Sequence, residues 1–175
     1  MPSQQATLDG LEADRGADVS SCGRYRYSLW RRWDATRPMA CFVMLNPSTA
    51  DASEDDPTIR KCIGFAKRWG AGGIRVVNLY PWRATNPRDL PNGREVGGEH
   101  TGVLSNNDAA ILAASCDAGW VVVAWGANHG PWPMQRVHVL DLLRNRRVCC
   151  LGRTADGSPR HPLMLAYTTE LEEMT

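Results

Sequence analysis

The sequence contains no apolar run that approaches the roughly 20 residues needed to cross a bilayer. Residues 1–21 also lack the basic start and the apolar stretch of a secretory signal peptide. These absences argue against a membrane or secreted protein, and we expect a cytoplasmic location. The length of 175 residues and a hydrophobic share of 43% suit one soluble domain with a single core.

Closely paired cysteines are missing as well. None of the six cysteines belongs to a C-x-x-C pair, so the spacing that zinc and iron–sulfur sites use is absent. Most of them stand in apolar surroundings, and we expect reduced packing residues. No metal and no cofactor is therefore expected. The cysteines are Cys22, Cys41, Cys62, Cys116, Cys149 and Cys150.

Three common catalytic signatures are absent too. The chain has no G-x-S-x-G, no Walker A motif and no G-x-G-x-x-G, so hydrolases, P-loop enzymes and dinucleotide-binding proteins lack their usual motifs here. The acidic stretch "DASEDDP" at 51–57 leaves two interpretations open. Its carboxylates suit a divalent cation, and they also suit a solvated helix start favoured by the helix dipole. We favour the helix start.

Lysine is scarce, because 18 of the 20 basic residues are Arg. The net charge of +1 conceals an uneven distribution, since residues 19–165 hold 19 Lys and Arg against 12 Asp and Glu. Arg binds phosphate in a bidentate manner and stacks on bases. The body of the chain is therefore compatible with a nucleic-acid partner, although codon bias explains the excess of Arg equally well.

The chain divides into three parts. Residues 1–20 are polar and acidic, which predicts a disordered N-terminal tail. Residues 21–167 are expected to form a single α/β/α domain, and residues 168–175 a C-terminal tail. Within the domain, residues 81–104 are rich in Pro, Gly, Arg and Asn and show no periodicity. A loop of that length is usually functional or mobile.

Four apolar runs predict core strands. They cover residues 39–45, 73–79, 119–125 and 147–151, and such continuous runs are typical of strands buried on both faces. We expect the four to form one parallel sheet. The stretch "GRYRYSLWRRW" at 23–33 alternates only in part, which suits an exposed or edge strand.

Helical patterns alternate with these runs. Asp56, Pro57 and Gly70 predict the N-cap, the first position and the C-terminal cap of one helix. A second helix starts at Ser105 in the manner of a capping box, and residues 133–147 predict a third. Strands that alternate with helices indicate a three-layer α/β/α sandwich around a four-stranded, mostly parallel sheet.

Polar and aromatic residues follow each predicted strand. The carboxyl ends of parallel strands meet at one edge of a sheet, where ligands bind. Amides, imidazoles, aromatic rings and Arg at that edge suit a planar polar heterocycle with a nearby phosphate. Each residue also has an ordinary structural explanation, such as a turn or core packing. The residues at this edge are Asn46, Pro47, Ser48, Asn78, Tyr80, Trp82, Arg83, Trp125, Ser158, Arg160, His161 and Leu163.

Five segments resemble a bacterial and phage family called domain of unknown function 1643. They are "YRYSLWRRW", "MLNPSTADASEDDPTIRKCIGFAKRWG", "VVNLYPWRATNPRDL", "VVVAWG" and "DGSPRHPLML". The resemblance covers about residues 23–165. It names a family without naming a reaction.

A more distant resemblance is to the uracil-DNA glycosylase superfamily, through the order "LNP", "VVN", "WG" and "HPL". This resemblance implies a parallel α/β/α sheet in which Asn46 positions a water and Asn78 reads the base. It also implies that His161 steadies the leaving base while Leu163 fills the vacated stack. A second alignment of the last motif places Ser158 where the superfamily has His. Both alignments stay open.

These patterns and the more distant resemblance leave three functions open. The first is a DNA glycosylase-like enzyme that hydrolyses the N-glycosidic bond of a flipped, modified or mismatched base, with Asn46 and His161 as catalytic residues and Tyr80 or Trp82 stacked on the base. The second is a non-catalytic nucleic-acid or nucleotide-binding module, which Ser158 favours. The third is an enzyme acting on free nucleosides or nucleotides. The expected partners are single- or double-stranded DNA and a nucleobase or nucleotide ligand, and we expect a monomer.

Overall fold

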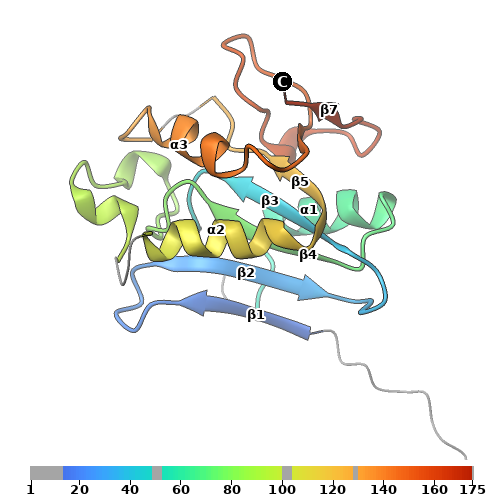
Figure 1. The fold of residues 1–175 in the computed structure, drawn as a ribbon, viewed down its shortest axis with the longest axis horizontal. Coiled ribbons are helices and arrows are strands. Elements are labelled where there is room, and N and C mark those ends of the chain that lie inside the picture. The colour runs from blue at the N-terminus through green and yellow to red at the C-terminus, as the bar shows by residue number, and fades with distance from the viewer. Residues whose placement is uncertain (1–13, 49–52, 100–103, 128–129, 175) are drawn as a thin grey trace, which may run out of the picture.

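The structure, a computed structural model, describes residues 14–48, 53–99, 104–127 and 130–174. Its centre is one sheet of seven strands in the order β1-β2-β4-β3-β5-β6-β7. Helices lie on both faces of this sheet, with α2 in front of it and α1 behind it in Figure 1. The α/β class expected from the sequence is confirmed.

The four apolar runs form the middle of the sheet. β3 (Met39–Met44) lies between β4 (Gly73–Asn78) and β5 (Ala118–Val123), and β6 (Val148–Cys150) follows β5. Each neighbouring pair in this set is parallel. The prediction that these runs form one parallel set is therefore confirmed.

The prediction of only four strands is wrong, because three antiparallel strands extend the sheet. β2 (Arg26–Arg32) pairs with β4, β1 (Asp14–Val19) pairs with β2, and β7 (Glu172–Glu173) pairs with β6. β2 is consequently not an edge strand, since β1 covers its outer side. Part of the expected C-terminal tail likewise belongs to the sheet. The sheet is mixed around a parallel centre.

β1 contradicts the prediction of a disordered tail over residues 1–20. Residues 14–19 form a strand, and residues 1–13 lie outside the described part of the chain. Strand pairing supplies hydrogen bonds to backbone N–H and C=O groups. A prediction of disorder that rests on the scarcity of apolar residues does not detect such pairing. Gly16 also leaves space for the indole ring of Trp30, which a Cβ at this position would overlap.

The helices are capped as their sequences predict. α1 (Pro57–Arg68) begins after Asp56, whose carboxylate accepts a backbone hydrogen bond from the first turn at 2.7 Å. α2 (Asn106–Cys116) begins after Ser105, whose hydroxyl does the same at 3.0 Å. α3 (Gln135–Leu142) is shorter at both ends than predicted. Among the described residues, no helix combines the length and the apolar character needed to cross a membrane.

The sheet separates two cores. α1 packs Phe65 against the face that carries Phe42, whereas α2 and α3 pack Ile111 and Val139 against the opposite face, which carries Val43. Side chains alternate along a strand, so β3 contributes to both cores. This arrangement buries the middle of β3 completely and leaves only its two ends near solvent.

The cysteines are free thiols, as the sequence predicts. Cys41, Cys62 and Cys150 are buried, whereas Cys22 and Cys116 are exposed. Burial raises the pKa of Cys41 to about 12, so this thiol stays protonated and unreactive at neutral pH.

Short 3-10 helices occupy two of the connecting segments. The long segment after β4 contains η1 (Pro87–Asp89) and η2 (Arg94–Gly97), while η3 (Pro162–Met164) lies in the segment after β6. The segment after β4 is tied to the end of β3, because the Ala84 N–H donates to the Pro47 carbonyl at 2.9 Å. The segment after β6 is tied to the end of β5, because the Gly126 N–H donates to the Pro159 carbonyl at 2.9 Å. Both segments therefore return to the carboxyl edge of the sheet.

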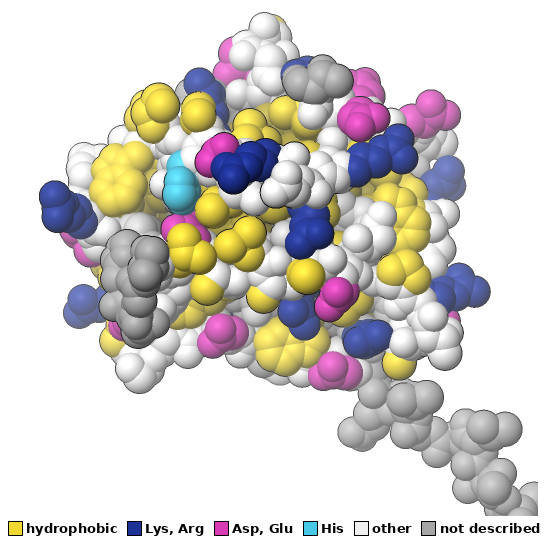
Figure 2. Space-filling model, in the orientation of Figure 1, with side chains coloured by type: hydrophobic (Ala, Val, Ile, Leu, Met, Phe, Trp, Pro, Cys, Tyr) yellow, Lys and Arg dark blue, Asp and Glu magenta, His cyan; other side chains and the backbone are white. Residues whose placement is uncertain are grey.

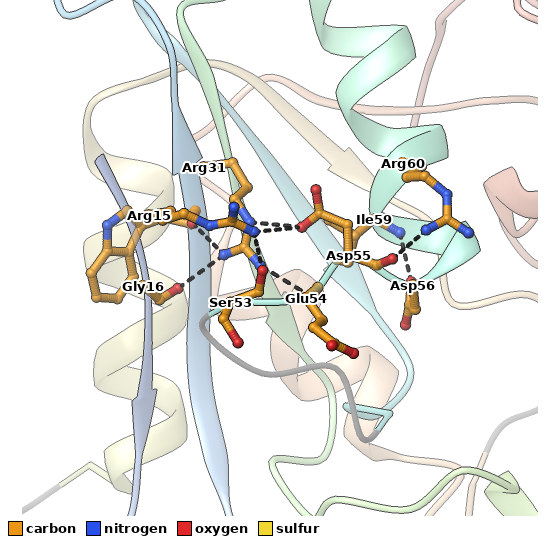
Figure 3. A network of polar contacts seen from close by, with 10 residues as sticks. Arg15, Gly16, Arg31, Ser53, Glu54, Asp55, Asp56, Ile59 and Arg60 are labelled. Carbon is orange, nitrogen blue, oxygen red and sulfur yellow. Dashed lines mark hydrogen bonds and ion pairs between the residues drawn. The ribbon is translucent and has the colours of Figure 1, made fainter. Parts of the chain in front are cut away.

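A buried ion pair joins the added strands to the segment before α1 (Figure 3). Arg31 on β2 is 5% exposed, and its Nε lies 2.7 Å from Oδ1 of Asp55. The same guanidinium donates to the backbone oxygen of Glu54 at 3.3 Å. Arg15 on β1 approaches Asp55 at 3.6 Å. This network fixes the segment that precedes Asp56 and so determines where α1 begins.

We predict that Arg31→Met destabilises the fold by about 2 kcal/mol. The substitution removes the buried partner of Asp55, and the loss stays below that of a fully enclosed pair because Asp55 is 26% exposed. Urea unfolding measures the change. Arg144→Met is the matched control, since Arg144 and Asp141 are each 67% exposed and such pairs contribute about 0.5 kcal/mol. Equal losses in the two variants would contradict the prediction.

Candidate functional site

The connections that follow two neighbouring strands, β3 and β5, leave the carboxyl edge of the sheet toward opposite faces. The chain continues from β3 through α1 to β4, whereas it continues from β5 through α3 to β6 on the other side. α1 and α3 belong to opposite faces. In open α/β sheets, ligands bind where successive connections diverge in this way. The edge predicted from the sequence therefore carries a crevice between the ends of β3 and β5.

A cavity of about 400 Å³ occupies this crevice. Its volume lies within the range of small-molecule sites. The end of β3, the start of α1, the segment after β4 and the end of β5 surround it, and the segment after β6 completes it. The polar side chains that line it include Asn46, Ser48, Asp56, Thr58, Thr85 and His161.

Asn46 lies just beyond β3 and lines the cavity. Its Nδ2 donates to the carbonyl oxygens of Pro47 at 3.1 Å and of Ala84 at 2.8 Å. Because both partners only accept hydrogen bonds, they fix which way the amide faces. Oδ1 has no hydrogen bond among the described residues and is the atom that can accept one from a ligand or a water. Pro47 itself is buried and does not line the cavity.

Asp56 combines helix capping with a place in the cavity. Its Oδ1 accepts from the Ile59 N–H at 2.7 Å, and its Oδ2 accepts from the Ser48 hydroxyl at 2.5 Å. Arg26 is 3% exposed; burial lowers the pKa of Arg26 to about 10, and the nearby Asp56 opposes that shift. The carboxylate is thus held firmly, and each of its oxygens keeps a further lone pair for a ligand.

His161 reaches the cavity from the segment after β6. Its Nδ1 accepts from the Leu163 N–H at 3.3 Å, so the neutral ring carries its proton on Nε2. Burial lowers the pKa of His161 below its ordinary value, although the negative charge of Asp56 acts in the opposite direction. The ring is therefore neutral near pH 7, with Nε2 as a hydrogen-bond donor.

Trp125 forms an apolar wall of the cavity at the end of β5. Its side chain is 3% exposed and also packs in the core between the sheet and α3. Its Nε1 is buried and has no hydrogen-bond partner among the described residues. An unpaired buried N–H costs about 1–3 kcal/mol. Trp125 therefore packs in the core and also lines the cavity.

Asn78 ends β4 but does not line the cavity. It is 2% exposed, and within the described residues its Oδ1 has no hydrogen-bond partner. Its backbone oxygen accepts from Nδ2 of Asn107 at 2.9 Å. Contact between this side chain and a ligand would require the cavity to extend toward β4.

The aromatic residues after β4 make structural contacts. Tyr80 is fully buried, and its hydroxyl donates to the Trp132 carbonyl at 2.7 Å. Tyr80 is therefore a core residue and not the stacking surface that the sequence predicts. The ring of Trp82 packs edge-on against Tyr25, with centroids 5.6 Å apart, and Arg83 donates to a backbone oxygen at 3.2 Å. Neither residue lines the cavity.

The residues of the last motif lie in different places. Ser158 is 5% exposed, and its hydroxyl donates to Asp156 at 3.1 Å, beside a separate cavity of about 160 Å³. Arg160 is exposed, and Leu163 on η3 is 39% exposed. Of the two residues that the open alignments offer, His161 lines the main cavity and Ser158 does not.

Three polar cavity residues are not predicted from the sequence. Asp56 is considered there as a helix cap or as one carboxylate of a cation site, and Thr58 lies in the turn that this cap begins. Their proximity to Asn46 in the sequence could have revealed both residues. A helix that starts soon after a strand places its first turn beside the end of that strand. Thr85 belongs to the long segment after β4, whose length alone suggests a function.

The cation interpretation of the stretch 51–57 receives no support. Residues 51 and 52 lie outside the described part, and Asp55 is engaged by Arg31. Within the described ranges, no three His, Cys, Asp or Glu side chains gather in a way that would hold a metal ion.

Comparison with known proteins identifies a family and no closer relative. The family model described as "Protein of unknown function (DUF1643)" matches residues 26–163, which is most of the chain. The matched region runs from β2 to η3 and contains every lining residue of the cavity. No curated protein and no solved structure matches the chain.

We predict that His161 titrates below the ordinary imidazole range, because burial disfavours its charged form. Since the folded state has the lower pKa, the unfolded chain binds more protons, and stability is lost as the pH falls below about 6.5. NMR of the imidazole signals against pH, combined with urea unfolding, measures both effects. Asp56→Asn should lower the pKa of His161 further, because the Asp56 charge favours the protonated ring.

The controls for this titration use the other described imidazole. His161→Gln should remove part of the stability loss below pH 6.5, whereas His138→Gln should leave the His161 titration unchanged. A His161 pKa above the ordinary value would contradict the prediction, because it would show that burial does not control this titration.

Proposed function

The chain belongs to the DUF1643 family, and we propose that it is a DNA glycosylase-like enzyme that hydrolyses the N-glycosidic bond of a flipped, modified or mismatched base. One observation carries this proposal. Asn46 and His161, which are far apart in the sequence, line the same cavity at the position where α/β sheets bind ligands. Their expected roles, a water for Asn46 and the leaving base for His161, require such a meeting.

In the proposed reaction, a water attacks the sugar carbon that carries the base. Oδ1 of Asn46 accepts one hydrogen of this water, while the two bonds of Nδ2 keep the amide from turning. Asp56 lines the same cavity and takes the proton that the attacking water loses. The sequence has Asn46 and no carboxylate directly after the first core strand, and Asp56 supplies one to the cavity.

The electron pair of the glycosidic bond leaves with the base. Nε2–H of the neutral His161 donates a hydrogen bond to the departing base and stabilises the negative charge that develops on it. A donor that is partly removed from water interacts with that charge more strongly than one in bulk solvent. A single positioned group of this kind typically contributes about 100-fold in rate.

Exposed apolar side chains stand next to the cavity. Leu163 and Met164 on η3 are 39% and 89% exposed, and they follow His161 after a single proline. A base that leaves the duplex opens a gap in the stack, and proteins that unstack DNA insert apolar side chains into such gaps. This position supports a base in a duplex as the substrate rather than a free nucleoside.

The charge distribution supports weak binding of the DNA backbone. Figure 2 shows basic and acidic side chains interspersed over the visible face, without a continuous basic band. Residues 19–165 nevertheless carry 19 Lys and Arg against 12 Asp and Glu. Contacts of Arg with phosphate release counterions, so binding that depends steeply on salt is expected.

A binding module without hydrolysis is the second candidate. The amide of Asn46 already holds Pro47 and Ala84 in place, which is a structural task that needs no catalysis. Ser158 also departs from the longer motif of the superfamily. A module of this kind would retain a base in the cavity without releasing it. The third candidate, an enzyme for free nucleosides or nucleotides, would act without any DNA.

Asn46→Ala should reduce single-turnover base release by about 100-fold, because it removes the acceptor for the water. The assay uses duplexes that contain uracil, hydroxymethyluracil, mismatched thymine or glucosylated bases. Asn86→Ala is the matched control, because Asn86 is an amide in the same segment as Ala84, caps η1 and does not line the cavity. Its rate should stay close to that of the parent protein.

The outcomes separate the candidates. If Asn46→Ala releases the base more slowly than the parent protein and binds the duplex equally well, the result supports the glycosylase. If the parent protein releases none of these bases and Asn46→Ala weakens binding instead, the enzyme proposal fails and the binding module replaces it. Release from free nucleosides alone would favour the third candidate.

Leu163→Ala should slow base release from duplexes about tenfold and leave release from single strands nearly unchanged. The physical reason is that unstacking a paired base costs a few kcal/mol, whereas a single strand presents the base already unstacked. Parallel assays on one oligonucleotide, with and without its complement, measure the difference. An equal loss on both substrates would show that Leu163 acts on the cavity and not on the stack.

A further inference from the structure

A second cavity lies at the opposite end of the parallel strands. It has a volume of about 150 Å³ and is lined by Arg32, Arg37 and Arg75 together with the end of α2. Its lining includes the end of β2 and the start of β3, and Figure 1 shows these two strand ends on its right-hand side. Met39 lines this cavity and Met44 lines the first one, so about 17 Å of β3 separates the two.

Two of the three arginines form no ion pair among the described residues, although Asp34 attracts Arg32 from a longer distance. Arg37 pairs with Asp34 at 3.1 Å. Arg32 donates to the Ala35 carbonyl at 3.0 Å, and the Arg75 side chain makes neither a hydrogen bond nor an ion pair within the described residues. The Nε atoms of Arg32 and Arg75 are buried without a hydrogen-bond partner. Burial of charged nitrogen atoms without partners is costly, which favours an anion beside them.

The register of β2 against β4 places these two arginines together. Trp30 stands opposite Arg75, and Arg32 stands opposite Gly73. Arg32 and Arg75 are therefore diagonal neighbours on one face of the sheet, and diagonal neighbours have Cα atoms about 7–8 Å apart. The Arg75 guanidinium lies 6.0 Å from the centre of the Trp30 ring, which restricts its orientation. Both guanidinium groups line one cavity, so they repel each other, and an anion between them offsets the repulsion.

Asp117 defines which anion fits. It is exposed at the rim of the cavity, caps the C-terminal end of α2, and is not within ion-pair distance of either arginine. A carboxylate and a helix C-terminus both repel a fully deprotonated anion. They accept a hydrogen bond, however, from an oxyanion that retains an O–H group.

We propose that this cavity binds a protonated phosphate, either inorganic hydrogen phosphate or the monoanion of a phosphate monoester. Arg32 and Arg75 donate to its oxygens, and Asp117 accepts its O–H. A cavity of about 150 Å³ holds a group of this size but is smaller than the sites that enclose a whole drug-sized ligand. The proposal does not depend on the function of the first cavity.

Calorimetric titration with sodium phosphate and with sodium sulfate, at one ionic strength, tests this assignment. The parent protein should bind phosphate more tightly than sulfate, because sulfate carries no proton for Asp117 at neutral pH. Arg75→Met should weaken phosphate binding by about 10-fold or more, as expected for the loss of charge-assisted hydrogen bonds. Asp117→Asn should bring the two affinities closer together, because an amide can donate to sulfate.

The control is Arg144→Met, which removes an exposed arginine paired with Asp141 elsewhere on the surface and should leave phosphate binding unchanged. Circular dichroism confirms that each variant is folded. The proposal is overturned if the parent protein does not bind phosphate, if it binds sulfate equally well, or if Arg75→Met binds phosphate as the parent does.

A third titration separates the possible sources of the phosphate. An oligonucleotide without terminal phosphates supplies only diesters, which have no O–H for Asp117. Unchanged oligonucleotide binding in Arg75→Met supports a protonated phosphate ligand. A loss of oligonucleotide binding in this variant would instead assign the cavity to the nucleic-acid backbone and overturn the proposal.

Discussion

The enclosure of β3 is the constraint on which the rest of the structure depends. Its backbone pairs with β4 on one side and with β5 on the other, and its side chains alternate between two cores. A strand enclosed in this way approaches solvent only at its two ends. Both cavities lie at these ends, the larger one where β3 passes into Asn46 and the smaller one where β3 begins. The two sites therefore share one rigid element.

The core of the fold was predictable from the sequence because it depends on apolar side chains, which local patterns report. The parallel strands and the caps at Asp56 and Ser105 follow from such patterns. β1 was not predictable, since it contains charged residues and pairs through its backbone. Its place is stabilised by contacts between distant positions, Gly16 with Trp30 and Arg15 with Asp55, and no local window contains both partners.

The candidate site was predictable to the extent that strand ends determine it. That rule brings Asn46 and His161 to the cavity, together with Trp125. It fails for Tyr80, whose side chain turns into the core and bonds with Trp132. The direction of a side chain just beyond a strand depends on what packs above it, and this information is tertiary. The same limit explains why Asp56 was recognised as a helix cap and not as part of the site.

Asn46 and Asp56 each hold the backbone in place with one part of the side chain and line the cavity with another. Selection for the fold alone would therefore retain both residues, because replacing either one would loosen the loop or the helix around it. Their persistence across relatives would be evidence of architecture as much as of chemistry. Thr58 and Thr85 line the cavity and carry no side-chain hydrogen bond within the described residues. Conservation of these two residues among relatives would therefore indicate ligand binding more directly than conservation of Asn46 or Asp56.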